Sequence, residues 1–364
     1  MFAEEFTQVQ SIIYEDDSVQ IVETPIGAKK AILYKTIMHA VKPGDDIVVN
    51  VTATNLHLGT GGYDFVKSVE QTGRYVSKEL TRQDGHILKL RYTPYQHQVL
   101  AIEAQESPYH SLFEQPFSLA GKPVLLGELH SMIPLVYATT QILKGNARVC
   151  VIIDDQAALP LAVSTMMRQL MKKKSFMTIT VGQAFGGSFE AITIQTALQF
   201  AHNHLHADVI MISVGPGVVG TGTHYGFTGM SLASWSNIVA SLKGLPVWIP
   251  RISFSDPRPR HFGISHHTLT PLKEFSLAKS LLPLPVFTGH RKVRIKEQLK
   301  ELEWAKVMPD IQWVCEKQMT PLTEEALTAS DVVIKTMGRG YQEDPSFFLS
   351  VVSSVWTSFN LGSE

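Results

Sequence analysis

The chain of 364 residues has few cysteines, few charges and no long apolar run. Only Cys150 and Cys315 are present, which excludes a disulfide framework and a zinc site made of four cysteines. Charged residues make up 18% of the chain and its formal net charge is -1, so no global field attracts it to nucleic acid or to an anionic membrane. No apolar run is long enough to span a membrane, and the first ten residues lack the features of a signal peptide. We therefore expect a cytoplasmic protein that binds neither nucleic acid nor a membrane.

Several catalytic signatures are also missing. The sequence contains no G-x-S-x-G, no P-loop lysine motif, no H-E-x-x-H and no paired-cysteine zinc spacing, which disfavours serine hydrolases, P-loop nucleotidases and zinc peptidases. Apolar residues nevertheless make up 44% of the chain, enough for a sizeable core. The length favours two domains over one.

Residues 1–118 have the pattern of a small β-rich domain. Short apolar or alternating runs recur, with turn signals such as Pro43-Gly44-Asp45 between them: SIIYED, VQIVET, KAILY, DIVVNVT, HILKLRY and HQVLAIEA. Because no helical pattern longer than two turns intervenes, we predict an antiparallel β-barrel or sandwich. A tract rich in proline and polar residues at 107–123 would serve as the linker.

Residues 119–364 alternate strand and helix patterns. Apolar runs at 124–129, 148–155, 176–181, 207–214, 245–250 and 331–336 are predicted strands. Strands that are apolar throughout and alternate with helices indicate a Rossmann-like, doubly wound, mostly parallel sheet. Ligands bind such sheets beyond the carboxyl ends of the strands, so the residues after each strand are the candidate functional residues.

A glycine-rich loop, GPGVVGTGTHYGFTG at 215–229, follows the fourth of these strands, and a helical pattern opens at Ser231. Glycine lets backbone amides approach a ligand closely. A strand, such a loop and a helix N-terminus together commonly bind a phosphate. We therefore predict an anion or nucleotide site here, with these ligand-binding residues: Gly215, Gly217, Gly220, Thr221, Gly222 and Thr223.

The same loop matches the dinucleotide fingerprint G-x-G-x-x-G, with two departures. Further loop follows the third glycine, and the acid expected about 20 residues later would fall in the apolar stretch near Ile238. A NAD(P)-dependent oxidoreductase is therefore an alternative hypothesis, and a merely structural glycine turn is a third interpretation.

Two other strand ends carry candidates. Gly186 and Gly187 lie in the loop GQAFGGS, where Ser188 could cap the next helix; a ligand role and a tight structural turn fit this loop equally well. Asp154 ends the strand at 148–155 and could hold a ribose, a substrate amine or Mg²⁺. Asp155 is well placed to cap the helix that follows.

The densest polar cluster follows the strand at 245–250. It comprises Arg251, Ser253, Asp256, Arg258, Arg260, His261, Ser265, His266, His267 and Thr268. Arginine side chains bind phosphate or carboxylate, histidines transfer protons near neutral pH, and so long a loop is costly to order without a ligand or partner. We predict that Arg251, Asp256 and Arg258 bind a ligand and that His266 and His267 are catalytic, with Asp154 as a third catalytic candidate. An arginine–aspartate network that only ties the loop down is the alternative.

We predict no metal site from spacing alone. His202 and His206 share a helical face within HNHLH. Because the sequence indicates no third metal ligand for them, a solvated helix end is the favoured interpretation. Glu128 and His130, at the end of the strand at 124–129, are a weaker acid–base candidate pair, and a cap or a surface site fits them equally well.

Five long motifs stand out together: LHLGTGGYDFV, GQAFGGSFEA, VGPGVVGTGTHYGFTG, RISFSDPRPRHFGISHHT and KTMGRGYQEDPSFF. In these the chain resembles an uncharacterised family of bacterial proteins, common in Gram-positive lineages and labelled a domain of unknown function. The resemblance covers nearly the whole chain. It implies a bacterial cytoplasmic protein, and it supplies no reaction, substrate or cofactor.

The sequence thus predicts a protein that binds a phosphate-bearing or nucleotide-like small molecule at the carboxyl edge of its α/β sheet, with catalysis left open. A non-catalytic sensor of a nucleotide or metabolite is one alternative, and a NAD(P)-dependent oxidoreductase is another. The candidate cofactors are a nucleotide, NAD(P) and Mg²⁺. Apolar helices such as SLASWSNIVASL would allow a homodimer.

Overall fold

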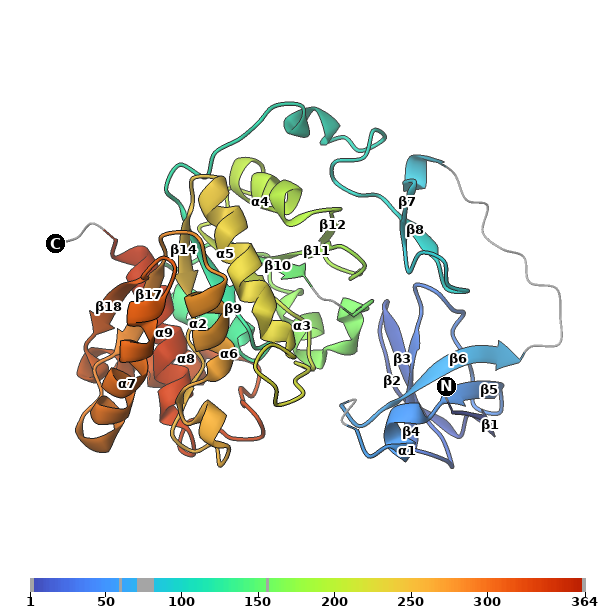
Figure 1. Cartoon of the computed structure of the whole chain (residues 1–364). Coiled ribbons are helices and arrows are strands. Elements are labelled where there is room, and N and C mark those ends of the chain that lie inside the picture. The colour runs from blue at the N-terminus through green and yellow to red at the C-terminus, as the bar shows by residue number, and fades with distance from the viewer. Residues whose placement is uncertain (1–2, 59–60, 71–81, 155–156, 362–364) are drawn as a thin grey trace.

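The computed structural model describes residues 3–58, 61–70, 82–154 and 157–361, and within them the chain forms two large sheets of different topology (Figure 1). The N-terminal sheet consists of β1 (Glu4–Gln8), β2 (Ser11–Glu15), β3 (Val19–Glu23), β4 (Lys30–Tyr34), β5 (Asp46–Asn50) and β6 (Asp64–Glu70), with the one-turn helix α1 (Thr52–Asn55). Its strand order is β1-β5-β6-β4-β3-β2. Neighbouring strands are antiparallel except β4 and β6, which are parallel.

The alternation of apolar residues in this sheet buries both of its faces. Val22 and Leu33 belong to the core on one face. Ile32 and Tyr34 point to the other face, where they pack together with Val163 of the α/β domain. Since side chains alternate along a strand, one set builds the domain's own core and the other builds its contact with the second domain.

The second sheet consists of eight strands, and every neighbouring pair is parallel. They are β9 (Pro123–Gly127), β10 (Val149–Asp154), β11 (Phe176–Val181), β12 (Phe189–Glu190), β13 (Val209–Ser213), β14 (Leu245–Trp248), β17 (Leu281–Pro285) and β18 (Asp310–Val314). Their order is β12-β11-β10-β13-β9-β14-β17-β18. The two sheets confirm the predicted fold class.

The strand order places a reversal point in the middle of the parallel sheet. The chain starts at β9, builds outward through β10, β11 and β12, returns to insert β13 between β10 and β9, and then builds the opposite side. Connections that leave in opposite directions open a crevice at the carboxyl ends of the central strands. The glycine-rich loop leaves β13 at this point.

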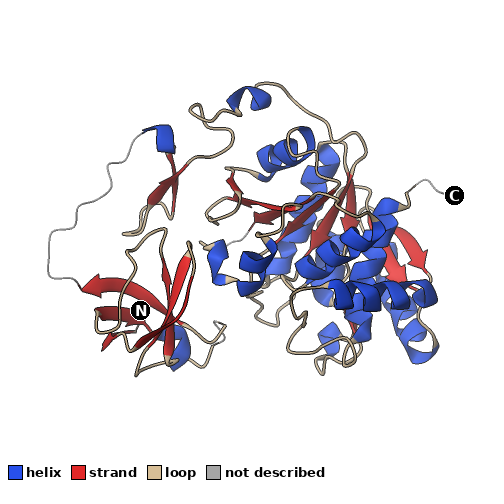
Figure 2. Ribbon diagram, turned by 180° about the vertical axis from the view of Figure 1, so that it is seen from behind, coloured by secondary structure: helices blue, strands red, loops and turns tan. Residues whose placement is uncertain are grey.

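Helices cover both faces of the parallel sheet (Figure 2). They are α2 (Met132–Leu143), α3 (Thr165–Leu170), α4 (Ile194–Asn203), α5 (Ser231–Ser241), α6 (His266–Glu274), α7 (Gly289–Glu301), α8 (Glu316–Ala329) and α9 (Pro345–Phe359). Helices α2, α8 and α9 pack on one another, while α5 packs against α4 and α6. The apolar residues of α5, including Leu232 and Trp235, are buried within the chain's own core. Among the described residues, no helix combines the length and apolarity needed to cross a bilayer.

Two predictions about individual elements are wrong, and two strands were not predicted. Residues 331–336 form no strand of the sheet. Val332 and Ile334 are buried while Val333 is exposed, so the segment packs on the core without joining the sheet. The helix expected from Ser188 begins at Ile194, with Thr193 as its cap, because residues 189–190 form β12. The last two strands of the sheet, β17 and β18, were not predicted. In β17, two prolines remove ladder donors and interrupt the strand pattern.

Two small ribbons complete the fold. β7 (Ile87–Lys89) pairs with β8 (His97–Val99), and β15 (Ile252–Ser253) pairs with β16 (Gly263–Ile264), both antiparallel. The β7–β8 hairpin is tied to the α/β domain by Lys89, whose side chain is only 1% exposed. Its Nζ donates to the carbonyl oxygens of Gly182 and Ala184, each at 2.9 Å, and lies 3.3 Å from Glu190 Oε2. Burial lowers the pKa of Lys89 and raises the pKa of Glu190.

Removing one charge of this buried pair is expected to destabilise the protein. Lys89→Met leaves the Glu190 carboxylate buried without its ammonium partner, which costs about 3–5 kcal/mol. Glu190→Gln in the same chain removes the unpaired charge. In urea unfolding, the double variant should therefore lose less free energy than the two single variants together. Additive losses would show that the two side chains are not coupled.

Candidate functional site

A cavity of about 860 Å³ lies between the N-terminal sheet and the carboxyl edge of the parallel sheet. Its α/β side is formed by loops that follow three neighbouring strands: residues 157–160 after β10, Phe185 after β11, and Pro216 and Gly217 after β13. Five aromatic rings line it: Tyr34, Tyr63, Phe65, Tyr95 and Phe185. Its volume falls within the range of small-molecule sites, about 300–1,000 Å³.

The glycine-rich loop closes on itself as a small hairpin at residues 220–227. Gly220 and Phe227 form an isolated antiparallel bridge, and the Thr221 amide donates to the Gly226 carbonyl at 2.8 Å. The Thr221 and Thr223 hydroxyls lie 2.8 Å apart, and Thr223 Oγ1 accepts a hydrogen bond from the Gly226 amide. Several donors that the sequence assigned to an anion are thus used inside the hairpin.

The other predicted residues of this loop lie in different surroundings. Gly217 lines the cavity and has a φ of +99°, with no atom within 4 Å of the position a Cβ would take. Gly220 packs beside the His267 ring, and Gly222 lies against the Arg260 guanidinium. Gly215, directly after β13, makes contacts within the protein. Only the start of the loop therefore faces the cavity.

The backbone amides of the loop after β11 also donate hydrogen bonds within the protein. Gly186 N donates to Glu190 Oε1 at 2.6 Å, and Gly187 N donates to Thr180 Oγ1 at 3.1 Å. A Cβ on Gly187 would lie 3.0 Å or less from three atoms of Thr180 and Phe189. Close packing in the β11–β12 turn therefore explains the glycine at 187.

Asp154 ends β10 on the strand next to β13. Its Oδ2 accepts a hydrogen bond of 2.6 Å from the indole Nε1 of Trp235 on α5. The carboxylate is thus held at the carboxyl edge, one strand away from the glycine-rich loop. Asp155 lies outside the described residues.

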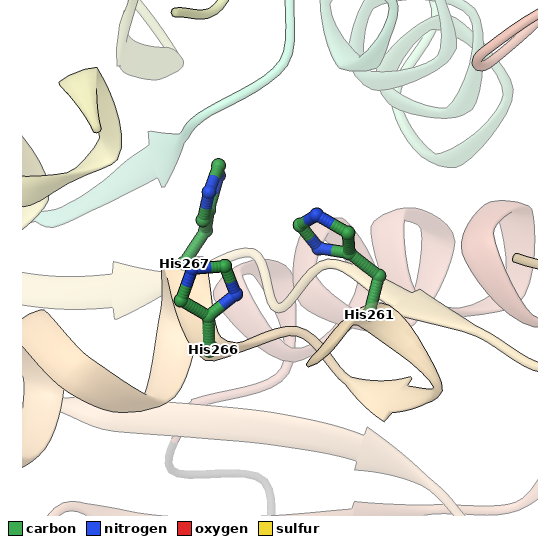
Figure 3. A group of neighbouring side chains, drawn as sticks. All are labelled: His261, His266 and His267. Carbon is green, nitrogen blue, oxygen red and sulfur yellow. The ribbon is translucent and has the colours of Figure 1, made fainter. Parts of the chain in front are cut away.

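Three histidines lie close together (Figure 3), and one of them, His267, contacts Gly220 of the glycine-rich loop. His261 precedes β16, while His266 and His267 open helix α6, which Ser265 caps by accepting the His267 amide at 3.1 Å. One ring nitrogen from each histidine lies within 4.8 Å of the other two. We call His261, His266 and His267 the histidine cluster. The sequence pointed to His266 and His267 and placed His261 in the same polar segment without a role; the H-x₄-H-H spacing was the available signal.

Each ring of the histidine cluster has a partner at Nδ1. That of His261 lies 2.7 Å from Ser265 Oγ, and that of His266 lies 3.3 Å from the Arg260 carbonyl oxygen. The Nδ1 of His267 contacts Glu128 Oε1. A carbonyl or carboxylate accepts the proton on Nδ1, so Nε2 of His266 and of His267 carries the lone pair in the neutral ring.

The environment keeps two of these rings uncharged. Burial, reinforced by the nearby Arg251 charge, lowers the pKa of His261 to about 3. Burial and the neighbouring His267 lower the pKa of His266 to about 4. The Phe227 ring stacks on His267, with centroids 4.1 Å apart and planes 2° from parallel. At neutral pH, His261 and His266 are therefore in the form that accepts a proton or binds a metal.

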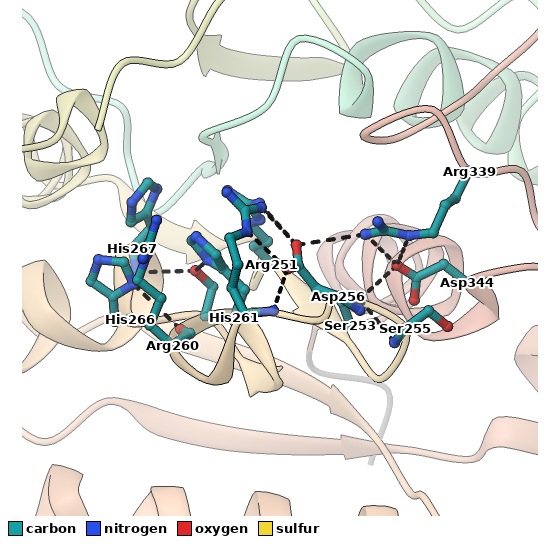
Figure 4. Close-up of polar contacts among 12 residues, drawn as sticks. Arg251, Ser253, Ser255, Asp256, Arg260, His261, His266, His267, Arg339 and Asp344 are labelled. Atoms are coloured by element: carbon teal, nitrogen blue, oxygen red, sulfur yellow. Dashed lines mark hydrogen bonds and ion pairs between the residues drawn. The ribbon is translucent and has the colours of Figure 1, made fainter. Parts of the chain in front are cut away.

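A buried network of charges adjoins the cluster (Figure 4). Arg251, 6% exposed, lies 3.4 Å from Glu128 Oε1 and 3.8 Å from Asp256 Oδ2. Arg258 donates to both oxygens of Asp256, at 2.9 and 2.7 Å, and these hydrogen bonds hold the pKa of Asp256 well below its usual range. Arg339 lies 3.7 Å from the same carboxylate. The three predicted residues Arg251, Asp256 and Arg258 are thus joined in the internal network that was the alternative to a ligand role.

Two buried carboxylate oxygens of this region have no hydrogen-bond partner within the described part of the chain: Glu128 Oε2 and Asp344 Oδ1. Arg260, in contrast, is exposed, and within the described ranges its guanidinium forms no hydrogen bond or ion pair. Its Nη1 lies 3.5 Å from the position of a Gly222 Cβ. Arg260 is therefore the arginine of this segment that can meet an anion.

Glu128 and His130 do not pair with each other. His130 Nδ1 donates to the Val214 carbonyl at 3.1 Å, and its Nε2 accepts from the Ser164 hydroxyl at 2.7 Å. Burial lowers the pKa of His130 to about 4. Protonation of Nε2 would remove the acceptor that Ser164 uses, so the ring is held neutral.

We predict that acid destabilises the protein partly through His130. In the unfolded chain a histidine takes up a proton near pH 6.5, whereas the folded His130 does so near pH 4. Between these values the unfolded state binds more protons, so the free energy of unfolding falls as the pH falls. His261 and His266 add to the same slope. His130→Gln should make the slope shallower in denaturant titrations from pH 7 to pH 4; an unchanged slope would contradict the assignment.

Comparison with known proteins places the chain in one family. A family model described as "Protein of unknown function (DUF3866)" matches residues 30–355. No curated protein matches the chain. The match runs from β4 of the N-terminal sheet into α9, and so includes the cavity, the glycine-rich loop and the histidine cluster. The chain therefore belongs to the family of proteins of unknown function DUF3866.

Proposed function

We propose that the protein binds a phosphate-bearing, nucleotide-like small molecule in the cavity between its two domains. The observation that carries this proposal is the cavity itself, about 860 Å³ in volume and built on the carboxyl ends of β10, β11 and β13. Loops at the reversal point of a doubly wound sheet are the usual place for such ligands.

The aromatic lining favours a planar group. Tyr63 and Tyr95 come from the N-terminal side, and Phe185 comes from the α/β side. Stacking of a base on an aromatic ring contributes about 1–3 kcal/mol. Because these rings come from both sides of the cavity, a base bound there can stack between them.

The start of the glycine-rich loop is the expected contact for the phosphate. Gly217 lines the cavity, and no atom occupies the space next to its Cα. A ligand can therefore approach the main chain there more closely than a side chain would allow. Lys67 also lines the cavity, and its ammonium group is ion-paired with Glu4.

A nicotinamide cofactor is the second candidate, and one observation favours it. In the dinucleotide-binding fold an acid at the end of the strand next to the glycine-loop strand binds a ribose. Asp154 ends β10, which pairs with β13 in the sheet, although β10 precedes the glycine-rich loop in the chain. The Trp235 indole donates a hydrogen bond to Asp154 Oδ2. This bond would hold the carboxylate in position for a hydroxyl group.

A thermal-shift titration tests the proposal. ATP, ADP, AMP, NAD⁺, NADP⁺ and a sugar phosphate are titrated separately against the full-length protein. A ligand at 100 times its Kd stabilises the folded state by about 2.7 kcal/mol, which a shift in Tm reports. We expect at least one nucleotide to raise the Tm in a saturable way. A panel that leaves the Tm unchanged would refute the proposal.

Variants then locate the bound molecule. Tyr63→Ala and Tyr95→Ala each remove a ring from the cavity and should weaken binding about tenfold, the equivalent of about 1.4 kcal/mol. Tyr92→Ala is the control, since Tyr92 is 97% exposed and does not line the cavity. Equal affinities in all three variants would place the ligand elsewhere. Turnover of the bound nucleotide would distinguish an enzyme from a sensor.

A further inference from the structure

We propose that His261, His266 and His267 bind a divalent transition-metal ion, and that this ion is Zn²⁺ or one of similar coordination chemistry. This site does not rest on the proposed nucleotide: it lies beside Gly220 of the glycine-rich loop, and none of the three histidines lines the cavity. Three histidines with a fourth position left open are a common ligand set for Zn²⁺ in catalytic sites.

The geometry already brings the ligand atoms together. One ring nitrogen of each histidine lies within 4.8 Å of the others. Two nitrogens bound at about 2.1 Å to a tetrahedral metal lie about 3.4 Å apart. His266 is half-buried, whereas His261 and His267 are buried at 2% and 5% exposure. We therefore expect His266 to make most of the movement that shortens these distances.

The hydrogen bonds at Nδ1 are those of a metal site. A metal-bound histidine usually donates its second ring N–H to a carboxylate, a carbonyl or water. His267 has the Glu128 carboxylate, and His266 has the Arg260 carbonyl. Both rings are thereby fixed in the tautomer whose Nε2 can bind a metal.

Glu128 provides an independent observation. It is 2% exposed, its Oε1 contacts His267, and its Oε2 has no hydrogen-bond partner in the described residues. A buried carboxylate with an unused oxygen is costly unless positive charge lies nearby. Arg251 supplies part of that charge at 3.4 Å, and a metal bound through His267 would supply more. Glu128 is thus a positioning residue.

The open coordination position would suit an anion. Arg260 is exposed beside Gly222, and Gly220 leaves the space next to His267 free of a side chain, since a Cβ there would lie 3.5 Å from Nε2. A water molecule or an anionic group such as a phosphate or carboxylate could therefore reach the metal. The Arg260 guanidinium, next to Gly222 of the hairpin, would then lie close to that anion.

Metal binding to the tag-free, full-length protein tests this proposal. The protein is treated with a chelator, dialysed, and titrated with Zn²⁺ by calorimetry and with Co²⁺ by absorption spectroscopy. We expect one ion per chain and Co²⁺ bands of a four- or five-coordinate site. His266→Ala should weaken Zn²⁺ binding at least 100-fold, and Glu128→Gln about 10–100-fold at the same stoichiometry.

His202→Ala is the matched control, because it removes a half-exposed histidine from the HNHLH segment and leaves the cluster intact. It should bind Zn²⁺ like the wild type. Circular dichroism checks that each variant is folded; His266 is half-exposed, so its loss should not disturb the core. The proposal is overturned if the folded wild type binds neither ion stoichiometrically, or if His266→Ala binds Zn²⁺ as well as His202→Ala does. Because no nucleotide is present, failure here leaves the cavity proposal untouched.

Discussion

The arrangement of the sheet edge depends on one buried carboxylate. Glu128 follows directly after the central strand β9 and is 2% exposed. Taking a carboxylate out of water costs several kcal/mol unless partners compensate it. Arg251, from the segment after β14, and His267, from the start of α6, are those partners. Their attachment to Glu128 fixes the long segment between them, and with it the orientation of the histidine cluster.

The glycine-rich loop borders both the cavity and the histidine cluster. Gly217 borders the cavity between the domains, whereas Gly220 packs beside the His267 ring. The hairpin at 220–227 separates them, and Phe227 stacks on His267 from within that hairpin. Gly217, which lines the cavity, and Gly220, which contacts His267, are therefore separated by only two residues of the chain.

The sequence predicted the fold class because parallel strands that are buried on both faces appear as uninterrupted apolar runs. It missed β17, where Pro283 breaks that pattern. The site was predicted only in outline. His266 and His267 belong to a visible polar segment, but the Glu128–His267 contact joins residues 139 positions apart, and no local pattern encodes such a distance. The Thr221 amide donates to the Gly226 carbonyl within the loop. Whether such an amide is free for a ligand depends on how the loop folds, which the sequence does not reveal.

The most direct measurement is anomalous diffraction from crystals of the protein grown with Zn²⁺, recorded on both sides of the zinc absorption edge. We expect a single strong peak within bonding distance of one nitrogen each of His261, His266 and His267, with the His267 Nδ1 still in contact with Glu128. A map without a peak at this position, or with its zinc at His202 and His206 instead, would contradict it.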